Sequence, residues 1–376
     1  MCVDRNPVAA APNPTAGPRR AGRLRTALLT LACLIATTAS AQNLEAPAAD
    51  WKALGSGAGF GEGRLHVVHG DDGWRIEDAV GETVALPFAA KAWPNDLERQ
   101  GDHWWAVATE PTADGLVPQV VAGRGSQVER LSGPSTGAKL ARDPVLLTSG
   151  KGLEALLWLE GPSVRQLVPK AATWGGEGWN PAVELAPVGP GTQIALTATV
   201  LADGSWLAAW AAFDGADDEI LWSRAVDGRW SEAQRLATDN DVPDVTPHLR
   251  ATTDGALIAW SRFDGSVYRV EVARFDDQGW SLPRTLGDPG TGFPRFLPGD
   301  TPLLAFQHSH PRAWSVVEMG DEGTPGRRAY GEAPHQSPPR IRERADGGLT
   351  LVWDGETITQ GAALTKTVPW SEGEGR

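Results

Sequence analysis

Three segments of the chain repeat a pattern in which proline is followed by a basic residue and then by an apolar one. The basic residues are His248, Arg295 and Arg340, which lie 47 and 45 residues apart. If the segments are equivalent strands of a repeat, these side chains would cluster with Arg250, and Arg142 is a further candidate member. Guanidinium groups bind carboxylates through paired hydrogen bonds, so such a cluster would bind an anionic ligand. The alternative is that these side chains are solvated or paired with neighbouring carboxylates.

An acidic turn and a pair of histidines are weaker candidates for metal binding. Asp214, Asp217 and Asp218 offer the hard oxygen ligands that Ca²⁺ prefers, but their spacing matches no EF-hand loop. A solvated turn between strands is the favoured alternative. His308 and His310 would point the same way in an extended chain, but no third ligand accompanies them. We therefore expect no metal ion and no cofactor.

The candidate residues lie within a repeat of roughly fifty residues. Its first motif is a turn, most often Asp-Gly, followed by an apolar strand that ends in an aromatic residue. Six copies begin at residues 102, 151, 203, 254, 300 and 346. Large aromatic side chains at a repeated strand position suit contacts between neighbouring sheets. We therefore expect a structural role for Trp104, Trp105, Trp158, Trp210, Trp260, Phe306 and Trp353.

A second motif alternates with the first and completes the repeat. Trp230 and Trp280 each follow a glycine-containing turn and precede a leucine by six residues. Segments of period two lie between the two motifs, so each repeat holds about four short strands, and no segment has a convincing helical period. A four-stranded antiparallel sheet cannot bury both faces alone, and such sheets stack radially as blades.

The sequence thus predicts an all-β fold, a β-propeller of four-stranded antiparallel blades. Six blades are favoured. The segment 64–80 resembles the outer half of a further blade. It would either pair with the last blade to close the propeller or begin a seventh blade together with residues 51–54.

The turn Gly279-Trp280-Ser281-Leu282-Pro283, the period and the Asp-Gly strand starts resemble the bacterial sialidase-like propellers, whose repeats are called BNR or Asp-box repeats. The resemblance covers residues 63–370 and concerns architecture. The Asp-box pattern is degenerate, because the copy from Ser223 to Trp230 has Ala225 where aspartate belongs.

The resemblance implies a sialidase active site, in which an arginine triad clamps the substrate carboxylate and a tyrosine paired with a glutamate is the nucleophile. Tyr330, with Glu332 as its base, is the candidate for that role here. The Arg-Ile-Pro-like motif of the family's first arginine has no match in this chain. The favoured function is therefore binding of a glycan or protein ligand at one face of the propeller, and the alternative is an exo-sialidase-like glycoside hydrolase that acts on a carboxylated sugar.

The N-terminal segment has the features of a secretory signal peptide. A run of arginines precedes the apolar residues 27–36, and Ala39-Ser40-Ala41 forms a small-residue cleavage site. We expect export to the periplasm or beyond the cell, with cleavage near Ala41. Lipidation at Cys33 and a twin-arginine signal at Arg19-Arg20 are alternatives. The expected division is a signal peptide 1–41, a lead-in 42–62, a propeller 63–370 and a tail 371–376.

The composition of the mature chain limits its partners. The leader holds five arginines and one aspartate, which leaves 29 basic against 46 acidic residues and a formal charge of −17. Such a surface repels nucleic acid and anionic lipid. Cys2 and Cys33 are the only cysteines, so a mature chain that begins at Gln42 contains no disulfide. No apolar segment is long enough to predict a membrane-spanning helix.

Overall fold

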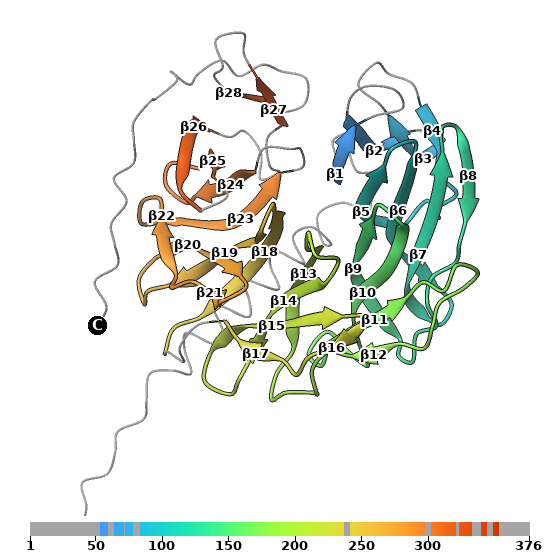
Figure 1. The fold of residues 1–376 in the computed structure, drawn as a ribbon, viewed down its shortest axis with the longest axis horizontal. Coiled ribbons are helices and arrows are strands. Elements are labelled where there is room, and N and C mark those ends of the chain that lie inside the picture. The colour runs from blue at the N-terminus through green and yellow to red at the C-terminus, as the bar shows by residue number, and fades with distance from the viewer. Residues whose placement is uncertain are drawn as a thin grey trace, which may run out of the picture. The chain divides into compact units, whose positions relative to one another are not determined.

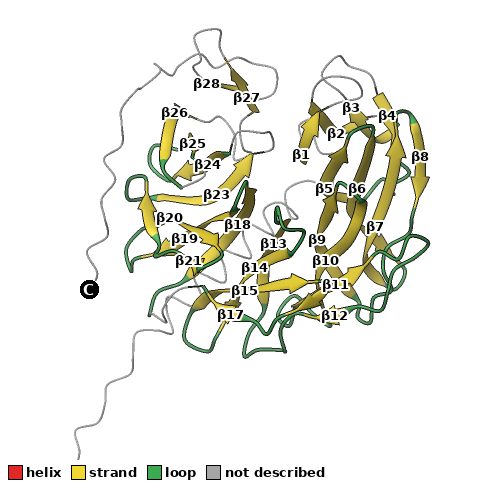
Figure 2. Cartoon of the chain, viewed as in Figure 1, coloured by secondary structure: helices red, strands yellow, loops and turns green. Residues whose placement is uncertain are grey.

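Every regular element in the described part of the chain is a β-strand (Figure 2). The computed structural model describes residues 53–58, 64–70, 72–77, 83–236, 241–297, 302–320, 323–332, 340–343 and 349–352. All of them belong to one unit, Ala49–Arg376. The described residues contain no helix with the length and apolar character needed to cross a membrane. The all-β prediction is confirmed, whereas the predicted leader and tail lie outside the described residues.

The strands form antiparallel meanders that follow one another in chain order, from blue to orange in Figure 1. The first sheet contains four strands, and the second contains eight. The eight strands are two four-stranded meanders joined by the parallel pairing of Leu116 with Leu140. The strands of the first sheet are β1 (Ala53–Ala58), β2 (Arg64–Gly70), β3 (Gly73–Glu77) and β4 (Thr83–Ala85). Those of the second are β5 (Trp93–Gln100), β6 (His103–Thr112), β7 (Gly115–Arg124), β8 (Gln127–Arg130), β9 (Leu140–Ser149), β10 (Gly152–Gly161), β11 (Val168–Thr173) and β12 (Val183–Glu184).

In the third and in the fourth sheet the outer strand is interrupted, so that two short strands pair with the same neighbour. The last described strands form a fifth sheet and a separate pair. The third sheet contains β13 (Gln193–Val200), β14 (Trp206–Phe213), β15 (Asp218–Val226), β16 (Arg229–Trp230) and β17 (Gln234–Arg235). The fourth contains β18 (Asp244–Thr252), β19 (Gly255–Phe263), β20 (Tyr268–Asp276), β21 (Gly279–Trp280) and β22 (Arg284–Leu286). The fifth contains β23 (Thr291–Leu297), β24 (Leu303–His308), β25 (Ala313–Met319) and β26 (Pro325–Glu332), and the pair is β27 (Arg340–Glu343) with β28 (Leu349–Val352).

The Trp-Ser motif of the sequence forms the break in the outer strand. Trp230 pairs with Ala225 of β15, and the N–H of Ser231 donates to the carbonyl oxygen of Arg224 at 2.8 Å. In the fourth sheet Ser281 makes the same bond to Arg274, also at 2.8 Å. The repeated motif therefore marks a repeated structural position.

Neighbouring sheets pack through shared hydrophobic layers. Side chains of β9–β11 pack against those of β14, side chains of β14 and β15 pack against those of β19, and side chains of β19 and β20 pack against those of β24 and β25. The aromatic residues at the ends of the second strands, Trp158, Trp210, Trp260 and Phe306, are fully buried in these layers or their neighbours. Their predicted structural role is confirmed, and Trp353 lies outside the described residues.

The first strand of each meander contacts the first strand of the next meander. This holds for β1 with β5, β5 with β9, β9 with β13, β13 with β18 and β18 with β23. A series of meanders in contact along their first strands is the arrangement expected of propeller blades. Because β1 pairs with β2, the segment from Arg64 belongs to a sheet of its own. Counting the eight-stranded sheet as two and the pair β27–β28 as one, the described strands form seven successive units.

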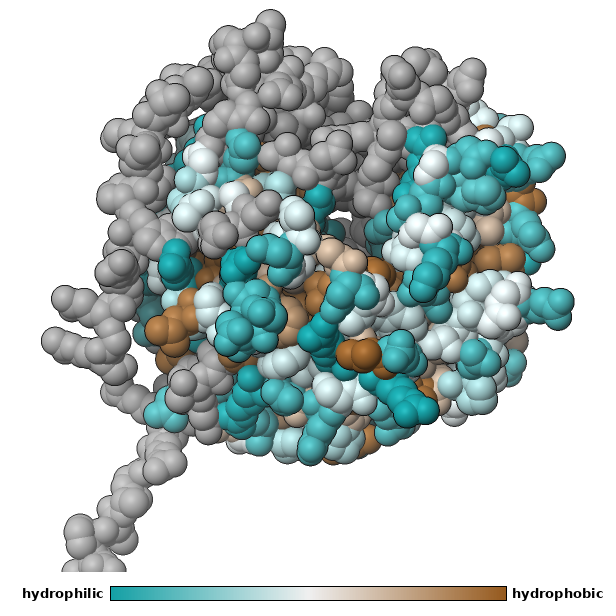
Figure 3. Space-filling view, in the orientation of Figure 1, coloured by the Kyte–Doolittle hydropathy of each residue, from teal (hydrophilic) through white to brown (hydrophobic). Residues whose placement is uncertain are grey.

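Hydrophilic side chains dominate the face drawn in Figure 3, and hydrophobic residues appear there in small separate patches. Single exposed apolar side chains are ordinary on a protein surface. The large hydrophobic residues that are exposed in the described part of the chain are Trp93, Val164, Val183, Val188, Val226 and Leu282.

Candidate functional site

The first strands carry β-bulges at equivalent positions. In β9, β13, β18 and β23 a residue other than glycine has a positive φ at the bulge, between 52° and 55°. This conformation is costly for β-branched and aromatic residues, and it persists where the surroundings enforce it. The four residues are Asp143, Ala195, Thr246 and Phe293. The bulge sets the same register in each strand, so the residues two positions later are equivalent.

At this equivalent position a side chain commonly ties one meander to the next. Thr197 Oγ1 accepts the N–H of Leu249 at 3.1 Å, which joins β13 to β18. His248 Nδ1 accepts the N–H of Phe296 at 3.4 Å, which joins β18 to β23. In the strand β5, whose register also shifts, Asp96 Oδ2 accepts the N–H of Leu146 at 2.9 Å. We call this set the clamp position.

Arg295 occupies the clamp position of β23, yet a guanidinium has no acceptor and cannot make this bond. Its side chain is exposed, while the surrounding protein desolvates the guanidinium and lowers its pKa. Within the described ranges no carboxylate lies at ion-pair distance from Arg295. Arg295 therefore combines an exposed side chain with reduced solvation of its charge.

The predicted neighbours of Arg295 lie beside it on β18. His248 is half-buried, and desolvation together with the charges of Arg295 and Arg250 lowers its pKa to about 3. Its ring is therefore neutral at physiological pH. Because Nδ1 accepts a hydrogen bond, the proton of the neutral ring lies on Nε2, which is a donor. Arg250 is held by a bond from Nη1 to the carbonyl oxygen of Leu297 at 3.1 Å. The structure thus brings together His248, Arg250 and Arg295.

The other two predicted arginines are placed differently. Arg142 on β9 pairs with its neighbour Asp143, with Nε to Oδ2 at 2.8 Å and Nη2 to Oδ1 at 3.3 Å. Its charge is therefore already neutralised within the strand. Arg340 begins β27 and pairs with Val352, and its side chain lies outside the described residues.

Tyr330 lies on β26, the outermost strand of the fifth sheet, whereas Arg295 lies on the innermost strand, β23. Three strand spacings separate the two strands, which corresponds to about 14 Å. Tyr330 pairs with Ser315, and its ring meets the ring of His308 edge to face at 5.3 Å. The structure does not bring this predicted nucleophile beside the arginines. The side chain of Glu332 lies outside the described residues.

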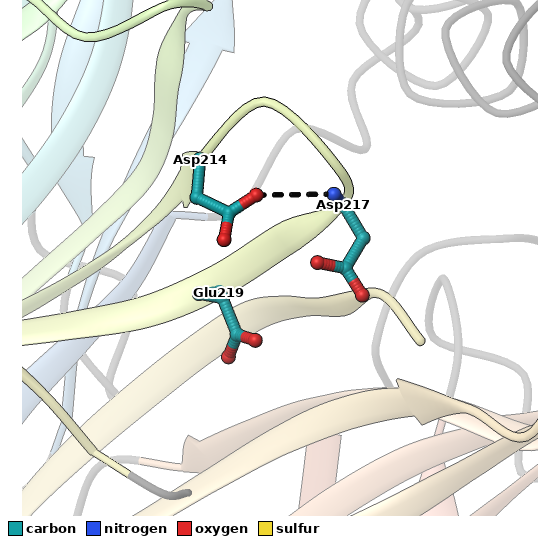
Figure 4. Close-up of side chains that lie close together, drawn as sticks. All are labelled: Asp214, Asp217 and Glu219. Carbon is teal, nitrogen blue, oxygen red and sulfur yellow. Dashed lines mark hydrogen bonds between the residues drawn. The ribbon is translucent and has the colours of Figure 1, made fainter. Parts of the chain in front are cut away.

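The acidic turn between β14 and β15 does gather three carboxylates, which Figure 4 shows. They belong to Asp214, Asp217 and Glu219, whose oxygen atoms lie within 4.8 Å of one another. Glu219 takes the place predicted for Asp218 because alternate residues of a strand point to opposite faces. Arg235 lies against the group, with Nη2 2.8 Å from Asp214 Oδ2 and Nη1 3.8 Å from Glu219 Oε1. A guanidinium therefore already compensates part of the negative charge.

Asp218 lies instead near Tyr268 of β20. Burial and the charge of Asp214 raise the pKa of Asp218 to about 6. Burial and the charge of Asp218 raise the pKa of Tyr268 to about 12. Each group therefore holds its proton more tightly than usual. The Tyr268 ring packs against Phe263 and Phe293 at 5.1 and 6.2 Å, which gives it a structural role between the sheets.

The sequence pattern missed two members of the clamp position, Asp96 and Thr197. Neither residue follows proline directly and neither is basic, so the pattern of proline, basic and apolar residues does not include them. The repeat period is the signal that could have identified them. Each residue bonds a partner about one period further along the chain: Asp96 lies 50 residues before Leu146, and Thr197 lies 52 residues before Leu249.

Comparison with known proteins found structural matches at low identity. No family model and no curated protein matches the chain. A family PL25 ulvan lyase superposes with a TM-score of 0.48 at 8% identity, over 77% of this chain and 89% of the lyase. A protein of unknown function from Dyadobacter fermentans gives 0.45 at 13% identity, over 64% and 82%. A xylan β-1,4-xylosidase from Bacillus halodurans gives 0.41 at 12% identity, and this chain spans 56% of its length while 71% of this chain is covered.

Proposed function

We propose that this chain is an exported β-propeller that binds an anionic ligand through Arg295 and Arg250, with neutral His248 as a hydrogen-bond donor beside them. The ligand would present a carboxylate, carried by a glycan or by a protein. Two guanidinium groups and an imidazole N–H match the acceptor oxygens of such a group.

The observation that carries this proposal is the state of Arg295. The side chain of Arg295 is exposed, but the surrounding protein reduces the solvation of its guanidinium, and an opposite charge beside such a group is favourable. The described residues supply no carboxylate to Arg295, and at this position three other meanders place side chains that accept a hydrogen bond from the next meander. A carboxylate ligand would supply the missing charge. Perturbed ionisable groups of this kind are common at functional sites.

The alternative of sialidase-like hydrolysis has weaker support. It requires Tyr330 close to the arginines that hold the substrate carboxylate. The three strand spacings between β26 and β23 argue against that arrangement. Binding without catalysis is therefore the function we propose.

The wider architecture and the location belong to the same proposal. We propose seven blades, one for each of the successive units, with β1–β4 as the first. The propeller would then begin at β1 rather than at residue 63 and continue towards residue 370. The leader 1–41 would direct the protein to the periplasm or beyond the cell, after cleavage near Ala41.

Calorimetric titration with glucuronate, N-acetylneuraminate and uncharged glucose tests the binding. We expect binding of a carboxylated sugar but not of glucose, and a loss of that binding of about tenfold or more in Arg295→Gln. Arg229→Gln is the matched control, because Arg229 is exposed on β16. A glycan array and a screen of acidic peptides extend the search to larger ligands. Equal binding by both variants to every anionic ligand would refute the proposal.

Hydrolysis is tested separately with a fluorogenic sialoside. The proposal predicts no turnover by the protein. Turnover that disappears in Tyr330→Phe would instead establish the glycoside hydrolase and contradict our placement of the site.

A further inference from the structure

A second cluster of polar side chains lies on one face of the fifth sheet. His308 comes from β24, Ser315 from β25, and Arg328 and Tyr330 from β26. The strand register places Ser315 opposite Tyr330, and Val317 opposite Arg328, so these side chains share a face. The same face carries Phe306 and Val317, which pack against residues of the fourth sheet. The cluster therefore belongs to the layer between the fourth and fifth sheets.

Ser315 connects the two basic side chains of the cluster. Arg328 Nη2 donates to Ser315 Oγ at 2.9 Å, and Ser315 Oγ lies 2.7 Å from His308 Nε2. Ser315 is fully buried, so its hydroxyl proton needs an acceptor in the protein, and His308 Nε2 is within reach. The ring of His308 is then neutral, with its proton on Nδ1. Burial and the charge of Arg328 lower the pKa of His308, in agreement with a neutral ring, while Asp288 opposes this effect.

Arg328 lacks the carboxylate that comparable arginines have. Its side chain is half-buried, and its Nε is buried with no hydrogen-bond partner. In the described part of the chain no carboxylate lies within 4 Å of its guanidinium. Arg224 is a direct comparison, because it also bonds a serine, Ser205, but it pairs with Asp203 as well. Leaving a partly buried guanidinium without an opposite charge is unfavourable.

We propose that the layer between the fourth and fifth sheets holds a second anion-binding site, which takes a small carboxylate on Arg328. His308 Nδ1–H and the hydroxyl of Tyr330 are the neighbouring donors. One guanidinium beside a neutral imidazole carries a single positive charge, and this matches a monoanion such as a carboxylate. The site is independent of Arg295, which lies on the opposite edge of the same sheet.

Acetate is the probe for this site. The imidazole signals of His308 are followed by NMR in the full-length protein during an acetate titration at constant ionic strength, with chloride as the reference anion. We expect saturable shifts with acetate and weakening of about tenfold or more in Arg328→Gln, whose amide can still donate to Ser315. Arg224→Gln is the matched control and should bind acetate as the wild type does.

Two further variants separate the outcomes. Tyr330→Phe removes one donor and should weaken acetate several-fold without changing the melting temperature. Arg295→Gln should leave the acetate response of His308 intact, which distinguishes this site from the one on the first strands. If acetate leaves His308 unchanged, or shifts it equally in Arg328→Gln, the site does not exist and water completes the bonds of Arg328.

Discussion

The carboxylate of Asp96 accepts the backbone N–H of Leu146 at 2.9 Å, and this bond ties β5 to β9 across two meanders. The same carboxylate also accepts the N–H of Leu97 at 2.9 Å. Burial nevertheless outweighs both bonds and raises the pKa of Asp96 to about 6. One side chain therefore serves both as a connection between two meanders and as a group whose pKa is raised to about 6.

Because the pKa of Asp96 is raised, we expect the protein to lose stability as the pH rises. Because its pKa is higher in the folded than in the unfolded chain, the folded state binds more protons between about pH 4 and pH 6, and the free energy of unfolding decreases across that window. The loss is at most about 3 kcal/mol. Asp96→Asn should remove this dependence while keeping an acceptor for Leu146. Urea unfolding at a series of pH values measures it, and equal slopes in both proteins would contradict the assignment.

For His248 we expect the opposite dependence of stability on pH, because its pKa is lowered. The pKa of His248 is lowered to about 3 in the folded protein, below the unfolded value of 6.5. Between these two pH values the folded state binds fewer protons than the unfolded state, so the free energy of unfolding falls as the pH drops below about 6.5. NMR of the imidazole should show a neutral ring down to about pH 5. A ring that titrates near its ordinary value would show that His248 is not desolvated beside Arg295 and Arg250.

Arg295 and Arg262 should respond in opposite ways to the loss of their charge. Arg262 binds both oxygens of the buried Asp244, at 2.8 and 2.9 Å, so Arg262→Gln should cost about 3–5 kcal/mol of unfolding free energy. Arg295→Gln removes a desolvated charge that has no carboxylate partner among the described residues, and it should leave stability unchanged or increase it. Chemical denaturation of the two variants side by side measures the difference. A large loss in Arg295→Gln would indicate a structural role.

Arg235 should stabilise the acidic turn. Replacing it with glutamine leaves Asp214 and the buried Glu219 without the guanidinium beside them, and we expect a loss of about 1–3 kcal/mol. Arg269→Gln is the control, because the Arg269–Asp264 pair is more exposed and should contribute less than about 1 kcal/mol. We expect Ca²⁺ to leave the wild-type melting temperature unchanged. A saturable rise with Ca²⁺ in the wild type would show that the turn binds the ion despite Arg235.

The strand content and the buried aromatic residues were predictable from local patterns. Alternation of side chains identifies a strand within a few residues, and Asp-Gly and Gly-Trp turns separate one strand from the next. Trp158, Trp210 and Trp260 recur at one repeat position, and all three are fully buried. The spacing of His248 and Arg295 likewise placed them at equivalent positions on adjacent first strands, where the structure has them.

The spatial relations between strands were less accessible. Glu219 rather than Asp218 completes the acidic group, because the face of a strand depends on a register that a turn can shift by one residue. Asp96 and Thr197 share a position with His248 but not its chemistry, so residue type alone could not group them.

By itself the sequence determined the repeat, the all-β fold, the buried aromatic residues and the candidate basic residues, because these depend on short-range alternation and on a regular period. The tertiary structure decided which candidates meet. Tyr330 and Arg295 belong to one sheet, but two further strands lie between theirs. Pairing order and burial are set by contacts between residues far apart in the chain, and the same contacts leave Arg295 and Arg328 without a carboxylate in the described part of the protein.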